Sequence, residues 1–85
     1  MTTNPRMAFI LISFQRGSRA FLDTASVLGK YEELFLGSIN VPIPESKDSA
    51  FGVLVKANTD QIGAITGTLG KIDGVKVKSA LLPED

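Results

Sequence analysis

Four short runs of apolar residues along the chain have the length and pattern of β-strands. Residues 8–14 (AFILISF) and 50–57 (AFGVLVKA) are apolar at nearly every position, which is typical of strands in the interior of a sheet. Residues 34–41 (LFLGSINV) contain Gly37, which indicates a bulge, and residues 75–82 (VKVKSALL) begin with a clean alternation. We therefore predict four strands, with the first and third at the centre of the sheet.

Two stretches between these strands repeat apolar residues at three- and four-residue spacing, which predicts two helices. Ser18 can cap the first helix by accepting a backbone N–H bond, and Asn58 or Thr59 can cap the second. Gly29 lies near the end of the first stripe, where helices commonly stop. The predicted buried stripes are Phe21, Thr24, Ala25, Leu28 and Tyr31 in the first helix, and Ile62, Ile65, Leu69 and Ile72 in the second.

Glycines lie among the apolar positions of the second helix, at Gly63, Gly67 and Gly70. An interior Gly destabilises a helix by about 1 kcal/mol relative to Ala. The sequence therefore predicts that this helix either packs closely against a neighbour at these positions or frays.

The order strand–helix–strand–strand–helix–strand predicts an α+β fold of the ferredoxin-like βαββαβ type. Right-handed crossovers place both helices on one face of a four-stranded antiparallel sheet, with strand order 4-1-3-2. One domain over residues 8–82 follows, with a disordered or frayed N-terminus at 1–7 and a tail at 83–85. An internal repeat supports a fold made of two similar βαβ units. The tripeptide LGK at residues 28–30 recurs at 69–71, and the strands match at the same offset.

The sheet face away from the helices is also predicted to be apolar, because the central strands are apolar on both faces. It would carry Phe9, Leu11 and Leu54. Monomers seldom expose an apolar face of several hundred Å², and a chain of 85 residues has a small core. We therefore expect these three residues to form the interface of a homodimer or homotetramer.

The amino-acid composition excludes several kinds of functional site. The chain has no Cys and no His, which excludes disulfides, thiolate and imidazole metal sites and a catalytic imidazole. We expect no metal, no cofactor and no enzymatic activity. Nine basic and nine acidic residues give zero net charge, which argues against direct DNA binding. The first apolar run is too short to span a bilayer and lacks the pattern of a signal peptide, so we expect a cytoplasmic protein without membrane association.

The segment from Gln15 to Ser18 is the strongest candidate for binding a small ligand. It leads from a strand into the start of a helix, where free backbone N–H groups attract anions. Arg16 and Arg19 would favour a carboxylate. Arg16, Gly17 and Ser18 are therefore candidate residues for a small anionic metabolite. The alternative is a connecting loop with ordinary surface arginines.

Residues 61–80 (QIGAITGTLGKIDGVKVKSA) resemble the C-terminal half of the family of iron-only hydrogenase system regulators. The resemblance covers residues 8–81 and implies a small ACT-like regulator that forms a dimer or tetramer. The second strand departs from the family pattern of glycine-arginine-methionine-glycine, an apolar residue and proline, because residues 37–42 read GSINVP. Asn40 can take the left-handed backbone of that second glycine, and we include it among the candidate ligand residues. Ser38 stands where the family has the arginine, so a ligand contact made by that arginine does not carry over to this chain by resemblance.

We expect a regulatory module linked to an iron-only hydrogenase or related metabolism, which senses a small ligand or mediates assembly, and we expect transcription regulation to be the process it serves. Two alternatives remain open. One is an interaction subunit without a small molecule. The other is a small enzyme of ferredoxin-like fold, such as a dimeric monooxygenase-type barrel. That last class normally uses His or other polar groups in an apolar cavity, whereas the predicted interior is nearly all aliphatic.

Overall fold

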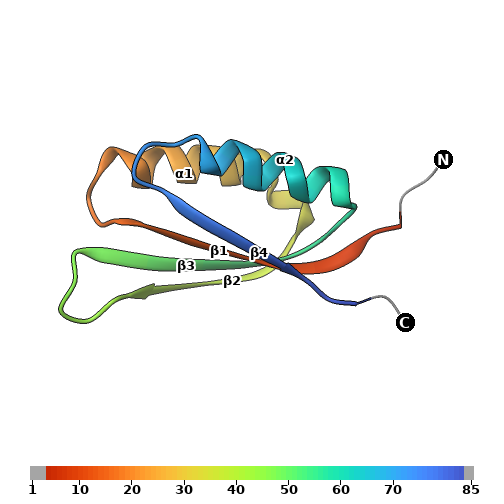
Figure 1. Ribbon diagram of the computed structural model, residues 1–85, viewed down its shortest axis with the longest axis horizontal. Coiled ribbons are helices and arrows are strands. Elements are labelled where there is room, and N and C mark those ends of the chain that lie inside the picture. Colours follow the sequence, from red (N-terminus) through yellow and green to blue (C-terminus); the bar gives the residue numbers. More distant parts are fainter. Residues whose placement is uncertain (1–3, 84–85) are drawn as a thin grey trace.

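The computed structural model describes residues 4–83 and has the predicted ferredoxin-like order of elements. Its sheet has the strand order β2-β3-β1-β4, and each neighbouring pair is antiparallel. Both helices pack on one face of this sheet (Figure 1). The predicted fold class and strand order are therefore confirmed. The elements are β1 (Arg6–Gln15), α1 (Arg19–Lys30), a short 3₁₀ helix η1 (Glu32–Leu34), β2 (Phe35–Pro42), β3 (Asp48–Ala57), α2 (Thr59–Gly70) and β4 (Lys76–Leu81).

The core lies between the helices and the two central strands, because alternate residues of these strands point to the helical side. Along β1, the odd-numbered side chains Phe9 and Leu11 are exposed, whereas their even-numbered neighbours are buried. Burial of these apolar side chains supplies most of the stability of a small domain. The strand residues of the core are Ala8, Ile10, Ile12, Phe14, Val53, Val55 and Ala57.

The opposite face of the sheet, which we call the outer face, carries the three residues predicted to form an oligomer interface. Phe9 and Leu11 are exposed, and Leu54 is half-buried opposite Phe9. The ring of Phe9 lies across Gly52, where an added Cβ would come within 2.3 Å of the Phe9 Cζ. The structure therefore confirms an apolar outer face, and its contact with a second copy stays a prediction.

Strand β1 begins earlier than expected. Arg6 and Met7, which were assigned to a frayed terminus, pair with Ala57 and Lys56 of β3. The Arg6 guanidinium also donates to the Leu82 carbonyl at 2.7 Å, so it fixes the end of the chain after β4. The prediction of disorder is wrong at these two residues. The prediction of disorder at residues 1–3 and the prediction of a tail at residues 84–85 lie outside the described part of the chain.

The first helix begins at Arg19, directly after Ser18, as predicted, but the predicted side-chain cap bond is absent. The Ser18 hydroxyl donates to the Gln15 carbonyl at 2.6 Å and accepts no capping bond, so the predicted side-chain cap is wrong. The helix continues through Gly29 to Lys30, and Tyr31 is its C-terminal cap. This end agrees with the prediction that the helix stops near Gly29.

The buried face of α1 is rotated relative to the predicted stripe. Thr24 and Leu28 are buried as expected, together with Ala20 and Val27. Phe21 and Ala25 are exposed instead, although Phe21 contacts the Phe14 ring at a centroid distance of 5.8 Å. The remaining member of the stripe, Tyr31, is half-buried after the helix.

The second helix has the predicted buried face but not the predicted close contacts. Asn58 caps it in a capping box: its side chain accepts from the Gln61 backbone N–H at 2.8 Å, and Gln61 Oε1 accepts from the Asn58 N–H at 3.0 Å. Ile62, Ile65 and Leu69 are buried. An added Cβ at Gly63 or Gly67 would meet no heavy atom within 4 Å, so close packing does not explain these glycines.

Candidate functional site

The turn between β1 and α1 is fixed to the hairpin between β2 and β3 by Arg16. The Arg16 backbone N–H donates to the Lys47 carbonyl at 2.7 Å, and its guanidinium donates to the Asp48 carbonyl at 2.6 Å and to the Ser46 carbonyl. Gly17 then takes a φ of 70°, in the left-handed region that favours glycine, and turns the chain into α1. These bonds hold the positive charge of Arg16 in a defined place.

A groove runs from this turn along the space between α1 and β2. It consists of two cavities of about 270 and 90 Å³ that share Phe14, Phe21 and Asn40, and we call it the α1/β2 groove. The larger cavity lies at the turn and the smaller one further along the helix. The other residues of the larger cavity are Arg16, Gly17 and Ser49, and those of the smaller are Thr24, Ala25, Leu28 and Phe51.

The two ends of the groove differ in polarity. Arg16 supplies a positive charge at the turn, and no acidic side chain in residues 4–83 forms an ion pair with it. Because its guanidinium bonds go to neutral carbonyls, its charge is not neutralised and further N–H groups remain for an anion. The other end is lined mainly by aromatic and aliphatic side chains.

Thr24 places one hydroxyl in this apolar end. Its side chain is only 2% exposed, and its Oγ1 has no hydrogen-bond partner within the described part of the chain. Buried hydroxyls in folded proteins are normally bonded. The groove therefore combines a positively charged side chain at one end with an unsatisfied hydroxyl near the other.

The structure brings together three of the four predicted ligand residues. Arg16, Gly17 and Asn40 line the same cavity. Asn40 lies opposite Phe51 in the sheet, on the side that faces the helices. Its backbone is not left-handed, since Glu45 is the only described residue other than Gly with a positive φ, so that prediction for Asn40 is wrong. Ser18 lies outside the groove and lines a different cavity.

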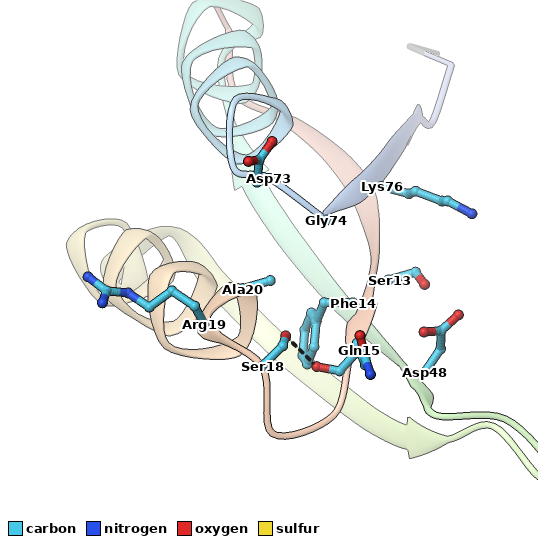
Figure 2. A pocket seen from close by; sticks show the side chains of 10 residues that line it. All are labelled: Ser13, Phe14, Gln15, Ser18, Arg19, Ala20, Asp48, Asp73, Gly74 and Lys76. Carbon is cyan, nitrogen blue, oxygen red and sulfur yellow. Dashed lines mark hydrogen bonds between the residues drawn. The ribbon is translucent and has the colours of Figure 1, made fainter.

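The cavity beside Ser18 is larger, about 420 Å³, but its charged side chains do not converge (Figure 2). It lies between the start of α1, the end of β1 and the turn before β4. Arg19 points away from it and bonds Asp23 through Nε at 3.2 Å, and Lys76 also points outward. We interpret this cavity as the open end between the helices and the sheet. Its lining is Ser13, Phe14, Gln15, Ser18, Arg19, Ala20, Asp48, Asp73, Gly74 and Lys76.

Two further classes of site receive no support from the described residues. In residues 4–83, no three His, Cys, Asp or Glu side chains gather in a way that could hold a metal ion. No helix in this part of the chain is long and apolar enough to cross a membrane.

Sequence reasoning missed the apolar members of the groove. Phe21 and Thr24 were assigned to the core because they share the helical spacing of buried residues. Phe51 lies on the face of the sheet toward the helices and also lines the groove. The sequence did contain one indication that Phe21 belongs to the site. Phe21 and Arg16 are close in the chain and flank the same predicted turn.

Comparison with solved structures places this fold among ACT-like domains. The crystal structure of the ACT domain from GTP pyrophosphokinase of Chlorobium tepidum has a TM-score of 0.73 at 17% identity, covering 89% of this chain and 99% of that one. The solution NMR structure of the same domain has a TM-score of 0.71 at 17% identity, covering 89% and 86%. At this identity the similarity concerns the fold.

A family assignment follows from a second comparison. The TM1266-like family, described as "Iron-only hydrogenase system regulator, putative", matches residues 6–79, and the chain belongs to this family. The structure of the uncharacterized protein TM1266 from Thermotoga maritima has a TM-score of 0.88 and 28% identity, and covers 93% of this chain and 99% of that one. The family resemblance predicted from residues 61–80 is confirmed. No curated protein matches the chain.

Proposed function

We propose that this protein regulates an iron-only hydrogenase system by binding a small anionic metabolite in the α1/β2 groove. The observation that carries the proposal is the convergence of Arg16, Gly17 and Asn40 on one cavity at the β1–α1 turn. The description of the family as a hydrogenase system regulator supports the regulatory role.

The chemistry of the groove suggests a ligand with a carboxylate and an apolar portion. The carboxylate would bind Arg16 through a charge-assisted hydrogen bond, which is among the stronger polar contacts in proteins. The Asn40 amide can donate to or accept from a second polar group. The apolar portion would lie against Phe14 and Phe21, which both cavities share.

Thermal unfolding in the presence of a panel of small carboxylic acids tests this function. A ligand at ten times its Kd stabilises the folded state by about 1.4 kcal/mol. In a domain of this size that corresponds to a rise in Tm of roughly 6–11 °C. We expect at least one member of the panel to produce such a rise.

The Arg16→Ala variant tests whether the ligand binds at this end of the groove. The substitution removes the bonds from the guanidinium to the hairpin carbonyls, so the Tm without ligand will also fall. The informative quantity is the rise caused by the ligand, which Arg16→Ala should abolish. Arg19→Ala is the matched control, because that guanidinium bonds Asp23 and points away, and its ligand-induced rise should equal that of the parent.

A second candidate function is an interaction subunit that binds no small molecule. The exposed hydrophobic side chains on the outer face and along β2 favour it. If no acid in the panel raises the Tm, or if the ligand raises the Tm of Arg16→Ala as much as that of the parent, the groove does not bind the ligand. The interaction subunit would then be the better description.

A further inference from the structure

Thr24 on α1 differs in its hydrogen bonding from the two threonines in the interior of α2. The Thr66 hydroxyl donates to the Ile62 carbonyl at 3.1 Å. The Thr68 hydroxyl likewise donates to the Ala64 carbonyl at 2.7 Å. Both bonds reach the carbonyl four residues earlier, which is a common arrangement for threonine in a helix. The Thr24 Oγ1 makes no such bond and has no other partner within the described part of the chain.

Burial makes this difference important, because Thr24 is also the most buried of the three. Its side chain is 2% exposed, whereas Thr66 is half-buried and Thr68 is exposed. A buried polar group without a partner destabilises the folded state, so natural proteins contain few of them. A ligand group that bonds the Thr24 hydroxyl would remove this penalty. The hydroxyl is therefore available for recognition of a group from outside the chain.

The Thr24 side chain forms part of the wall of the smaller cavity of the α1/β2 groove. Asn40 is the one other polar residue of that wall, and it also lines the larger cavity. The volume of about 90 Å³ is several times the roughly 10–15 Å³ that one water molecule needs. Buried water typically makes about three hydrogen bonds, and this wall offers only two polar side chains. The cavity thus suits a ligand group better than a single water molecule.

We propose that Thr24 recognises a hydroxyl on the ligand, so that the groove selects hydroxylated carboxylic acids over the same acids without the hydroxyl. This inference rests on the proposed function, because the carboxylate is bound by Arg16 at the other end of the groove. A hydroxyl can donate one hydrogen bond and accept others, so it can bond Thr24 and Asn40 together. Arg16 then selects an acid, and Thr24 determines which acid binds most tightly.

The position of Thr24 along α1 limits the length of the ligand. Thr24 follows Arg19, the first residue of the helix, by five positions. At a rise of 1.5 Å per residue, this is about 7.5 Å along the helix axis. The carboxylate and the hydroxyl should therefore lie on the order of 7 Å apart, with the apolar portion between them. An aromatic ring in that portion could pack against Phe14 and Phe21, which line both cavities.

Calorimetric titration of the whole chain with matched pairs of acids provides the first test. The pairs are phenylacetate with 4-hydroxyphenylacetate, 3-phenylpropanoate with 3-(4-hydroxyphenyl)propanoate, and hexanoate with 6-hydroxyhexanoate. In at least one pair, the parent should bind the hydroxylated acid with a Kd at least tenfold lower, which corresponds to about 1.4 kcal/mol. Thr24→Val replaces the hydroxyl by a methyl group and should bind both acids of that pair equally. Thr24→Ser keeps the hydroxyl and should keep the preference.

Thr66→Val is the matched control, because Thr66 is a helical threonine that does not line the groove, and its preference should equal that of the parent. If the acids bind through Arg16 but the parent shows no preference, or if Thr24→Val keeps the preference, the proposal for Thr24 is overturned and the proposed function stands. If none of the acids binds the parent, both the proposed function and this inference are overturned.

Thermal unfolding without ligand gives a second test. Because the Thr24 hydroxyl has no partner in the described part of the chain, its replacement in Thr24→Val should leave the Tm unchanged or raise it. Thr66→Val loses the bond to the Ile62 carbonyl and should have a lower Tm. A fall of about 4 °C or more in Thr24→Val would show that the hydroxyl is already bonded in the free protein, and would contradict the proposal.

Discussion

Replacement of the exposed glycines of α2 by alanine should stabilise the domain. Gly63 and Gly67 lie inside the helix, are exposed, and have room for a Cβ, since no heavy atom would lie within 4 Å of it. Gly→Ala at such positions restricts the unfolded chain without a steric penalty in the folded one. We expect Gly63→Ala and Gly67→Ala each to raise the free energy of unfolding.

The magnitude follows from helix propensity. Gly is about 0.8–1.0 kcal/mol less favourable than Ala in a helix interior. In a domain of 60–100 residues, 1 kcal/mol changes the Tm by about 4–8 °C. One helical turn separates the two positions, and neither added methyl group meets a neighbour. The effects should therefore add, to roughly 2 kcal/mol in the double variant.

Thermal and urea unfolding monitored by circular dichroism measure this effect, at one fixed protein concentration because self-association would raise the Tm. Gly74→Ala is the control, since Gly74 has a φ of 84° and the same substitution there is strained by about 1–2 kcal/mol. It should lower the Tm. If Gly63→Ala or Gly67→Ala also lowered the Tm, the exposed face of α2 would be in contact with another molecule, and the reasoning would be refuted.

Three further predictions concern the core and the outer face. Leu69→Asp should unfold the domain because Leu69 is fully buried, whereas Lys71→Asp should change the Tm by less than about 2 °C because Lys71 is exposed; equal Tm values would contradict the assigned face. Gly52→Ala should destabilise by about 1–3 kcal/mol by displacing the Phe9 ring, and a double-mutant cycle with Phe9→Ala should recover most of that loss. Leu54→Lys should lower the mass measured by light scattering if the outer face contacts a second copy, and an unchanged mass would remove that contact.

The sequence determined the sheet more reliably than the ends of the helices. The apolar runs at residues 8–14 and 50–57 are typical of central strands, so the strand order was predictable from local pattern. Capping depends on small differences in backbone direction: Asn58 and Gln61 form reciprocal bonds, while Ser18 turns back to the Gln15 carbonyl. Sequence spacing does not distinguish these two outcomes.

The candidate site was predicted only in part, for a similar reason. The position of Arg16 at a strand-to-helix turn was visible in the sequence, but its bonds to the β2–β3 hairpin depend on tertiary structure. Asn40 was selected for a left-handed backbone that it does not have, and it reaches the groove from an extended strand instead. Phe21 shares the spacing of core residues, and the rotation of α1 that exposes it is set by packing against the sheet.

The unequal edges of the sheet also determine how far an assembly could grow. A sheet with two uncharged edges can add copies head to tail without limit, and such open growth produces fibres. Of the two edge strands, β4 carries the exposed Lys76 and Lys78 whereas β2 carries no charged residue, so the addition of further copies through β4 is opposed by its lysines. Replacement of Lys76 and Lys78 by Val would remove this barrier to polymerisation.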